Sequence, residues 1–477
     1  MSPHPRRWEA LPVILVATFM ALFDVFVVNV AAPSLQRDLH ASSSDLQLVV
    51  GGYSFSYAAL LVTGGRLGDR YSYRLGFLGG MALFTIASLA CGLATSPSVL
   101  IGARVVQGIG AAVMVPQVLA LITALFPPEE RTRALAWFGV AVGLGAIAGQ
   151  ILGGALVQVN WFGWGWRMVF AVNIPIGIAT IALGARLLPR DRSSLHPQLD
   201  GIGVLGVTGA LALALIPLTL GHDQGWPWWL VVPLCLSPLA FVAAARYERG
   251  LARRGGQPVL DLALFRFRSF SAGVLVTIGV FMYFGSVLLG LTLFLQLGLG
   301  LSALDAGLTF APLGVSFALT SIAARRLVAR YGPRVASAGI VVAFTALLVQ
   351  VLDIHFSGNA IDAQRLAPVF FLVGIGNGLV IPSLIGVSLV DVAPNEAGAA
   401  AGTLATGQQF ALAAGVAVLS EIFFTALGHH PAKHNYIHAI QYVFVLDIAL
   451  LAASFAVSLL LPRPRRQPVP EPAFEAA

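Results

Sequence analysis

Charge is scarce along this chain of 477 residues: aspartate, glutamate, lysine and arginine together make up 10% of it. A soluble domain carries roughly 25% charged residues, so the composition excludes a soluble protein. Hydrophobic residues instead make up 57%. Apolar runs of about 20 residues recur from end to end, each long enough to cross a bilayer core of roughly 30 Å. We therefore expect an all-α polytopic membrane protein.

Cysteine and lysine are scarcer still. The two cysteines, Cys91 and Cys235, both fall inside apolar runs, which excludes a disulfide framework. Lys433 is the single lysine among 28 basic residues, a bias typical of a GC-rich bacterial genome. The net charge of +7 is confined to short loops between apolar runs, so we expect no nucleic-acid partner. We also expect no metal site and no organic cofactor. The chain lacks a nucleotide-binding lysine motif, so we expect its energy to come from a proton gradient.

The apolar runs define fourteen predicted spans. They cover residues 11–33, 46–64, 76–94, 98–121, 134–156, 168–188, 201–220, 228–245, 270–293, 304–323, 335–353, 366–389, 399–424 and 440–461. The first run lacks a small-residue cleavage site, so we expect it to be a retained helix.

Basic residues predict the orientation of these spans. With a cytoplasmic N-terminus, the inside segments hold 23 arginines, the outside segments hold four basic residues, and Arg104 lies within a span. Cytoplasmic loops of membrane proteins carry an excess of lysine and arginine. We therefore predict that both termini are cytoplasmic, in a bacterial inner membrane.

A short basic loop occurs twice, 260 residues apart. Residues 66–74 read RLGDRYSYR, and residues 326–334 read RLVARYGPR. Each copy follows the second span of its half, which is typical of transporters built from two related halves. If the loops are equivalent, spans 1–6 match spans 9–14, and spans 7–8 are inserted. The predicted units are a six-helix half at 1–190, inserted helices at 191–269, a second half at 270–461 and a cytoplasmic tail at 462–477.

Several motifs resemble those of the major facilitator superfamily, and more narrowly its fourteen-helix drug:proton antiporter branch. They are GRLGDR at 65–70 with Arg74, FDVFVVNVAAP at 23–33, RVVQGIG at 104–110, GVAVGLGAIAGQILGG at 139–154, Trp166-Arg167, NIPIG at 173–177 and Leu295-Gln296. The chain departs from the family where Ser72 and Tyr73 replace a glycine and a basic residue, and where Gln150 replaces the proline of the antiporter motif. The resemblance implies a major facilitator fold with two inserted helices.

Asp24 and Arg104 are the strongest candidates for a functional site. An acid or a base within a span is costly and marks an ion pathway more often than a packing contact. Burial and a nearby cation act in opposite directions on a carboxyl group, so conformation can switch its protonation. The two residues lie at comparable depths, which permits an interaction, direct or through water.

Glycines of the fifth span form a second candidate. Gly145, Gly149 and Gly153 repeat every four residues and make a smooth stripe that allows close helix approach. We expect this stripe to seal the two halves against each other in one conformation. Three further glycines, Gly139, Gly143 and Gly154, extend the small surface.

The first basic loop is predicted to be a cytoplasmic latch formed by Gly65, Asp69, Arg70 and Arg74. A carboxylate there can cap a helix or pair with arginine across the halves. Glu421 is a further candidate for substrate or proton binding. Asp447 is interpreted as a packing or interfacial acid, and both acids are expected toward the outer side of their spans.

The motifs favour a proton-driven exporter of amphipathic or cationic drugs that works by alternating access, not an enzyme. Its expected partners are such small molecules, protons and the lipid bilayer, and we expect a monomer. Two alternatives stay open: a proton-coupled metabolite transporter on the same fold, and a membrane sensor that does not transport.

Overall fold

The structure is a computed structural model that describes residues 5–159, 163–190, 200–256, 258–392, 397–428 and 432–462. The described residues are helical throughout. The α-helices are α1 (Arg7–Leu39), α2 (Ser43–Arg70), α3 (Tyr73–Gly92), α4 (Pro97–Leu125), α5 (Pro128–Val159), α6 (Met168–Ala171), α7 (Asn173–Leu187), α8 (Gly201–Gln224), α9 (Trp228–Arg253), α10 (Arg268–Leu293), α11 (Ala303–Thr309), α12 (Ala311–Tyr331), α13 (Arg334–Ser357), α14 (Ala363–Ser388), α15 (Ala397–Leu427) and α16 (Lys433–Ser458).

Fourteen stretches of the described residues are long and apolar enough to cross a membrane, which confirms the predicted number of spans. The sixth span combines α6 and α7, and the tenth combines α11 and α12. The last span begins at Lys433, seven residues earlier than predicted. Asp447 therefore lies about 21 Å along α16, at 1.5 Å per residue, which is near its middle. The expectation that Asp447 lies toward the outer side is wrong.

Side-chain caps fix where many of these helices begin. Ser42, Ser96, Ser302 and Asp362 each precede a helix, and the side chain of each accepts a hydrogen bond from a backbone N–H of the first turn. Such caps satisfy amide groups that have no partner within the helix. The short loops of this chain therefore carry clear helix-start signals.

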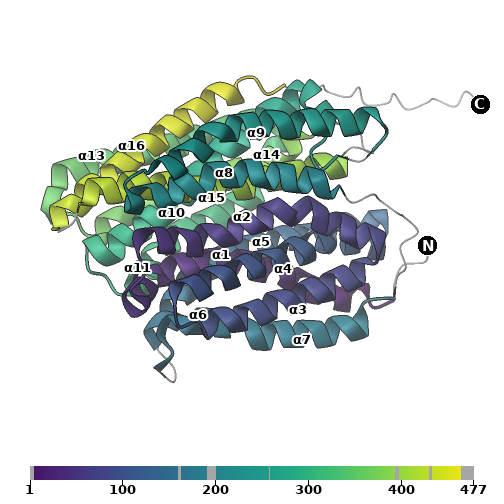
Figure 1. The fold of residues 1–477 in the computed structure, drawn as a ribbon, viewed down its shortest axis with the longest axis horizontal. Helices are drawn as coiled ribbons and strands as arrows, with labels where there is room; N and C mark the ends of the chain where they lie inside the picture. The colour runs from purple at the N-terminus through teal and green to yellow at the C-terminus, as the bar shows by residue number, and fades with distance from the viewer. Residues whose placement is uncertain are drawn as a thin grey trace, which may run out of the picture.

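The helices form two groups that lie side by side (Figure 1). Helices α1–α7 pack among themselves, and α10–α16 pack among themselves. The groups meet where α2 packs against α15 and where α5 packs against α11 and α12. Helices α8 and α9 pack against each other, and α8 also contacts α2 and α15. The unit boundaries at residues 190, 269 and 461 stay a prediction.

Glycine contacts repeat between the two groups. Gly108 of α4 lies against Ser56 and the Tyr53 carbonyl of α2, and Gly374 of α14 lies in the same way against Ser316 and the Leu313 carbonyl of α12. Two residues further along α4, a Cβ on Gly110 would lie 2.6 Å from the Phe84 nitrogen. Two residues further along α14, a Cβ on Gly376 would lie 2.7 Å from the Ala343 nitrogen. Both pairs of contacts exclude any larger residue, so the duplication that the basic loops indicate extends to helix packing.

Candidate functional site: a buried ion pair between α1 and α4

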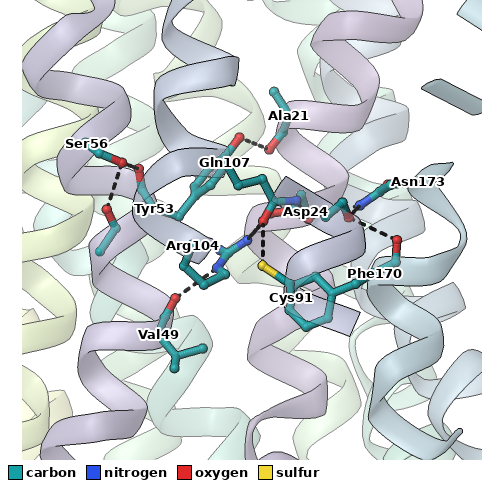
Figure 2. A network of polar contacts seen from close by, with 12 residues as sticks. Ala21, Asp24, Val49, Tyr53, Ser56, Cys91, Arg104, Gln107, Phe170 and Asn173 are labelled. Atoms are coloured by element: carbon teal, nitrogen blue, oxygen red, sulfur yellow. Dashed lines mark hydrogen bonds and ion pairs between the residues drawn. The ribbon is translucent and has the colours of Figure 1, made fainter. Parts of the chain in front are cut away.

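The first group of helices holds a fully buried ion pair. Asp24 on α1 is 0% exposed and Arg104 on α4 is 1% exposed. The Arg104 Nη1 donates directly to the Asp24 Oδ2 (Figure 2). The sequence placed the two side chains at comparable depths, and the structure brings them into contact without an intervening atom.

Two amides complete the shell around the carboxylate. The Gln107 Nε2 donates to the Asp24 Oδ1 at 2.8 Å, and the Asn173 Nδ2 donates to the same oxygen at 3.1 Å. Asn173 also donates to Ser88 on α3 at 3.1 Å. The Asp24 carboxylate thus accepts hydrogen bonds from three side chains and links α1 with α4 and α7 (Figure 2).

Arg104 is held from several sides. Its Nε donates to the Val49 carbonyl at 3.0 Å, and its Nη1 also donates to the Gln107 Oε1 at 2.7 Å. The guanidinium lies 4.5 Å from the centre of the Tyr53 ring, a cation–π contact. The Tyr53 hydroxyl in turn donates to the Ala21 carbonyl of α1 at 3.1 Å.

This arrangement makes the contact between α1 and α4 depend on the charge of Asp24. Removing the charge of one partner in a buried pair leaves the other uncompensated, which is costly in low dielectric. Protonation of Asp24 would therefore weaken its hold on Arg104 and loosen the contact between α1 and α4. Gln107 and Asn173 were recognised only as members of family motifs, without a role of their own. Nothing in the sequence marked Tyr53 as part of the site.

The glycine stripe of α5 lies against α1 within the same group of helices. A Cβ on Gly145 would lie 2.8 Å from the Phe19 oxygen, and one on Gly149 would lie 2.7 Å from the Phe26 Cβ. Gly153 meets Val27 of α1 in the same way. In this conformation these glycines therefore face α1, the helix that carries Asp24, and not the other half. The seal between the halves that we expect in one conformation stays a prediction.

Of the six glycines, Gly154 is the one placed against the other group. A Cβ there would lie 2.9 Å from the Ala303 carbonyl carbon of α11. In the reciprocal contact, a Cβ on Gly307 of α11 would lie 2.7 Å from the backbone carbonyl oxygen of Gln150. Gly139 is exposed, and a Cβ on Gly143 would meet open space.

A small cavity of about 30 Å³ lies between the groups, beside these contacts. Four phenylalanines line it together with Gln150, and neither the oxygen nor the nitrogen of the Gln150 side-chain amide has a hydrogen-bond partner among the described residues. The phenylalanines are Phe26, Phe284, Phe310 and Phe317. The residue that replaces the family's proline therefore brings an unpaired amide into an aromatic cavity.

Glu421 lies away from this cavity, six residues before the end of α15. Its Oε1 accepts a hydrogen bond from the Trp226 Nε1 at 3.2 Å. Trp226 belongs to the connection between α8 and α9, so the inserted pair covers this acid. The structure does not bring Glu421 together with Asp24 and Arg104.

Arginines of the first basic loop donate hydrogen bonds to backbone carbonyls of other segments. Arg74 donates to the Ala185 carbonyl of α7 at 2.6 Å, and Arg66 donates to the Pro258 carbonyl in the segment between α9 and α10. Arg70 lies 5.6 Å from the Tyr71 ring centre, and Gly65 packs on Pro116. Asp69 is half-buried and interacts electrostatically with Arg66. The predicted latch did not include Arg66, which reaches beyond the first group to Pro258. The role of these residues as a latch stays a prediction.

An all-helical chain of fourteen spans in two related groups, with a buried ion pair in one of them, defines a membrane transporter of the two-half type. The model of the Major Facilitator Superfamily matches residues 14–416, and the chain belongs to this superfamily. It is a multi-pass membrane protein of a transporter family, not an enzyme family.

Similar proteins agree with this assignment. The chain is 39% identical over 427 residues to a probable actinorhodin transporter of Streptomyces coelicolor, covering 89% of this chain and 74% of that protein. It is 36% identical over 468 residues to the puromycin resistance protein pur8 of Streptomyces alboniger, covering 96% and 90%. A bacterial homologue of the human lysosomal transporter Spinster, in an inward-facing conformation, shares the fold with a TM-score of 0.70 at 17% identity, covering 98% of this chain and 99% of that one. The chain is thus related to drug and antibiotic transporters and resistance proteins.

Proposed function

We propose that the protein exports amphipathic or cationic small molecules of the antibiotic class in exchange for protons, by alternating access. One observation carries the proton part of this proposal: Asp24 is fully buried, and Arg104 is its only ion-pair partner among the described residues. In this proposal Asp24 is the coupling acid and Arg104 is its counter-charge. The names of the similar proteins, which speak of actinorhodin and puromycin, support an antibiotic substrate.

The substrate is proposed to bind near the cavity between the groups. Its phenylalanines favour apolar and aromatic surfaces, and the Gln150 amide offers both a hydrogen-bond donor group and an acceptor oxygen. We expect Gln150→Leu to weaken binding of substrates that carry a hydroxyl or carbonyl group, by about tenfold for one lost hydrogen bond. Substrate binding to purified protein measures this effect.

We further propose that both termini are cytoplasmic in a bacterial inner membrane. The arginine asymmetry between alternate loops supports this orientation. A reporter fused after residue 225, between α8 and α9, is expected outside, and one fused after residue 256 is expected inside. The opposite signals would contradict this orientation of the inserted pair.

Transport in sealed vesicles tests proton coupling directly. An imposed pH gradient is expected to drive substrate movement by the wild-type protein. Asp24→Asn is expected to abolish this movement, because the amide keeps hydrogen bonds but cannot titrate. Insertion and monodispersity of the variant serve as the control for folding. Full gradient-driven transport by Asp24→Asn would exclude Asp24 as the coupling acid.

The same vesicles separate the alternatives. A metabolite importer would move substrate in the same direction as the proton, and a sensor would move none. Neither has a specific observation in its favour, so each stands as an outcome of this experiment.

A further inference from the structure

The second group of helices contains its own buried acid, Asp447 on α16. It is 0% exposed and lies near the middle of its helix. The Ser286 Oγ of α10 donates to its Oδ2 at 3.1 Å, while its Oδ1 has no partner among the described residues. The buried face of α16 around Asp447 includes Val443 and packs on α10.

The repeated glycine contacts identify the residue of the second group that stands where Arg104 stands in the first. Arg104 stands four residues before Gly108, and Phe370 stands four residues before Gly374, the equivalent glycine. Phe370 thus takes the place of the arginine in the second group. It stacks on Phe310 with ring centres 5.3 Å apart.

The buried acid of the second group does not lie on α10, the helix that corresponds to α1 and its Asp24. Gly149 packs on the Phe23 carbonyl, one residue before Asp24, and Gly415 packs on the Met282 carbonyl, one residue before Tyr283. Tyr283 therefore takes the place of Asp24, and its hydroxyl accepts a 3.4 Å hydrogen bond from Asn377. Asp447 lies on the last span of its group, as Asn173 does in the first group.

The surroundings of Asp447 leave an ionised carboxylate uncompensated. The titratable and charged residues on the three helices packed against α16 are Tyr283, Arg268, Arg334, Asp353, His355 and Glu421. The two arginines, Asp353 and His355 lie in the end turns of their helices, and Glu421 lies six residues before the end of α15. Tyr283 interacts electrostatically with Asp447. On α16 itself, the other titratable residues fall within 433–442. A buried carboxylate without a cation costs several kcal/mol, so Asp447 is neutral in this conformation.

From this geometry we propose that Asp447 is a second proton-binding site, which carries a proton that moves during the transport cycle. The proposal rests on the proton exchange proposed above. In the conformation described here Asp447 holds its proton while Asp24 is ionised against Arg104. When α10 and α16 separate and water reaches the carboxyl group, the O–H bond breaks and the proton passes to water. Reprotonation from water on the other side restores the neutral acid.

Infrared spectroscopy tests the proton directly and does not depend on transport. Spectra of the purified full-length protein are compared as the pH is stepped from acid to alkaline. We expect a carbonyl-stretch band of a protonated carboxylic acid that disappears at alkaline pH in the wild type and is missing in Asp447→Asn. Asp353→Asn, which changes an acid in the last turn of α13, is the matched control and is expected to keep the band. Ser286→Ala keeps the acid but removes its donor, so the band is expected to shift.

Coupling measurements in vesicles then decide whether this proton moves. Asp447→Asn is expected to transport substrate with one fewer proton per cycle than the wild type. The inference would be overturned if Asp447→Asn moved as many protons per cycle as the wild type and the wild-type band persisted at every pH. Asp447 would then be a permanently neutral packing residue. If the wild type shows no proton coupling at all, the proposed function fails, while the infrared result still reports whether Asp447 titrates.

Discussion

The two groups of helices in this protein share their packing but differ at their centres. Gly108 and Gly374 make equivalent contacts, as do Gly110 and Gly376. The first group buries the ion pair of Asp24 with Arg104 among amide donors, whereas the second buries the acid Asp447 with a single hydroxyl donor. Steric contacts between helices therefore persisted after duplication, while the charges between them diverged.

The proposed protonation states of the two acids follow from this difference between the groups. An arginine cannot lose its proton within a protein, so it holds Asp24 as a carboxylate wherever the two remain in contact. A phenylalanine at the equivalent place removes that constraint. Three pairs of matched substitutions, one residue of each pair in each group, test this difference.

The largest effect is expected from Arg104→Gln, compared with Phe370→Leu in the second group. Loss of the guanidinium leaves Asp24 buried and unpaired, which costs on the order of 3–5 kcal/mol of unfolding free energy and abolishes transport. Phe370→Leu conserves most of the volume and is expected to cost less than about 1.5 kcal/mol. Thermal unfolding in detergent measures both.

The double variant Asp24→Asn with Arg104→Gln sharpens this result. It replaces the ion pair by neutral amides, so we expect it to recover most of the stability that Arg104→Gln loses, without recovering transport. Equal instability of the single and double variants would show that Arg104 contributes through packing and not through charge.

A smaller effect is expected from Gly149→Leu and Gly415→Leu. Each glycine packs its helix on the first helix of its group, so a leucine forces the helices apart at a cost on the order of 1–3 kcal/mol. We expect both proteins to insert but to transport at least about tenfold more slowly, since such a cost shifts a two-state equilibrium that far.

Substrate flux and passive proton flux in the same vesicles measure these effects. Gly143→Ala and Gly407→Ala are the controls on the same two helices, because a Cβ at either site meets open space. Wild-type rates in both leucine variants would show that close packing against the first helix does not matter for transport.

The smallest effect is expected from the two copies of the basic loop. Arg66 holds the Pro258 carbonyl and thereby the segment between α9 and α10, whereas Arg326 in the second copy is exposed. Arg66→Ala is expected to speed tryptic cleavage at Arg253 and Arg254 severalfold, because one charged hydrogen bond contributes about 1.5–3 kcal/mol. Arg326→Ala is the matched control. Equal cleavage rates in the two variants would argue against a tether through Arg66.

The sequence alone determined the class of protein, the number of spans and the main charged site. Apolar run lengths depend only on the thickness of the bilayer, and they predicted fourteen spans correctly. Asp24 and Arg104 were identifiable because charged residues are rare within apolar runs and because helix rise fixes their depth. The family motifs added the fold.

Only the tertiary structure decided which surfaces meet. The glycine stripe of α5 was visible in the sequence, but its partner was α1 and not the other half, because the rotation of each helix about its axis is set by packing. Asp447 was expected toward the outer side of its span, but the full length of α16 and the contact with Ser286 place it, buried, near the middle of the helix. Asn173 donates to Asp24, which is 149 positions away along the chain, and Arg66 donates to Pro258, which is 192 positions away. No local pattern in the sequence encodes such contacts.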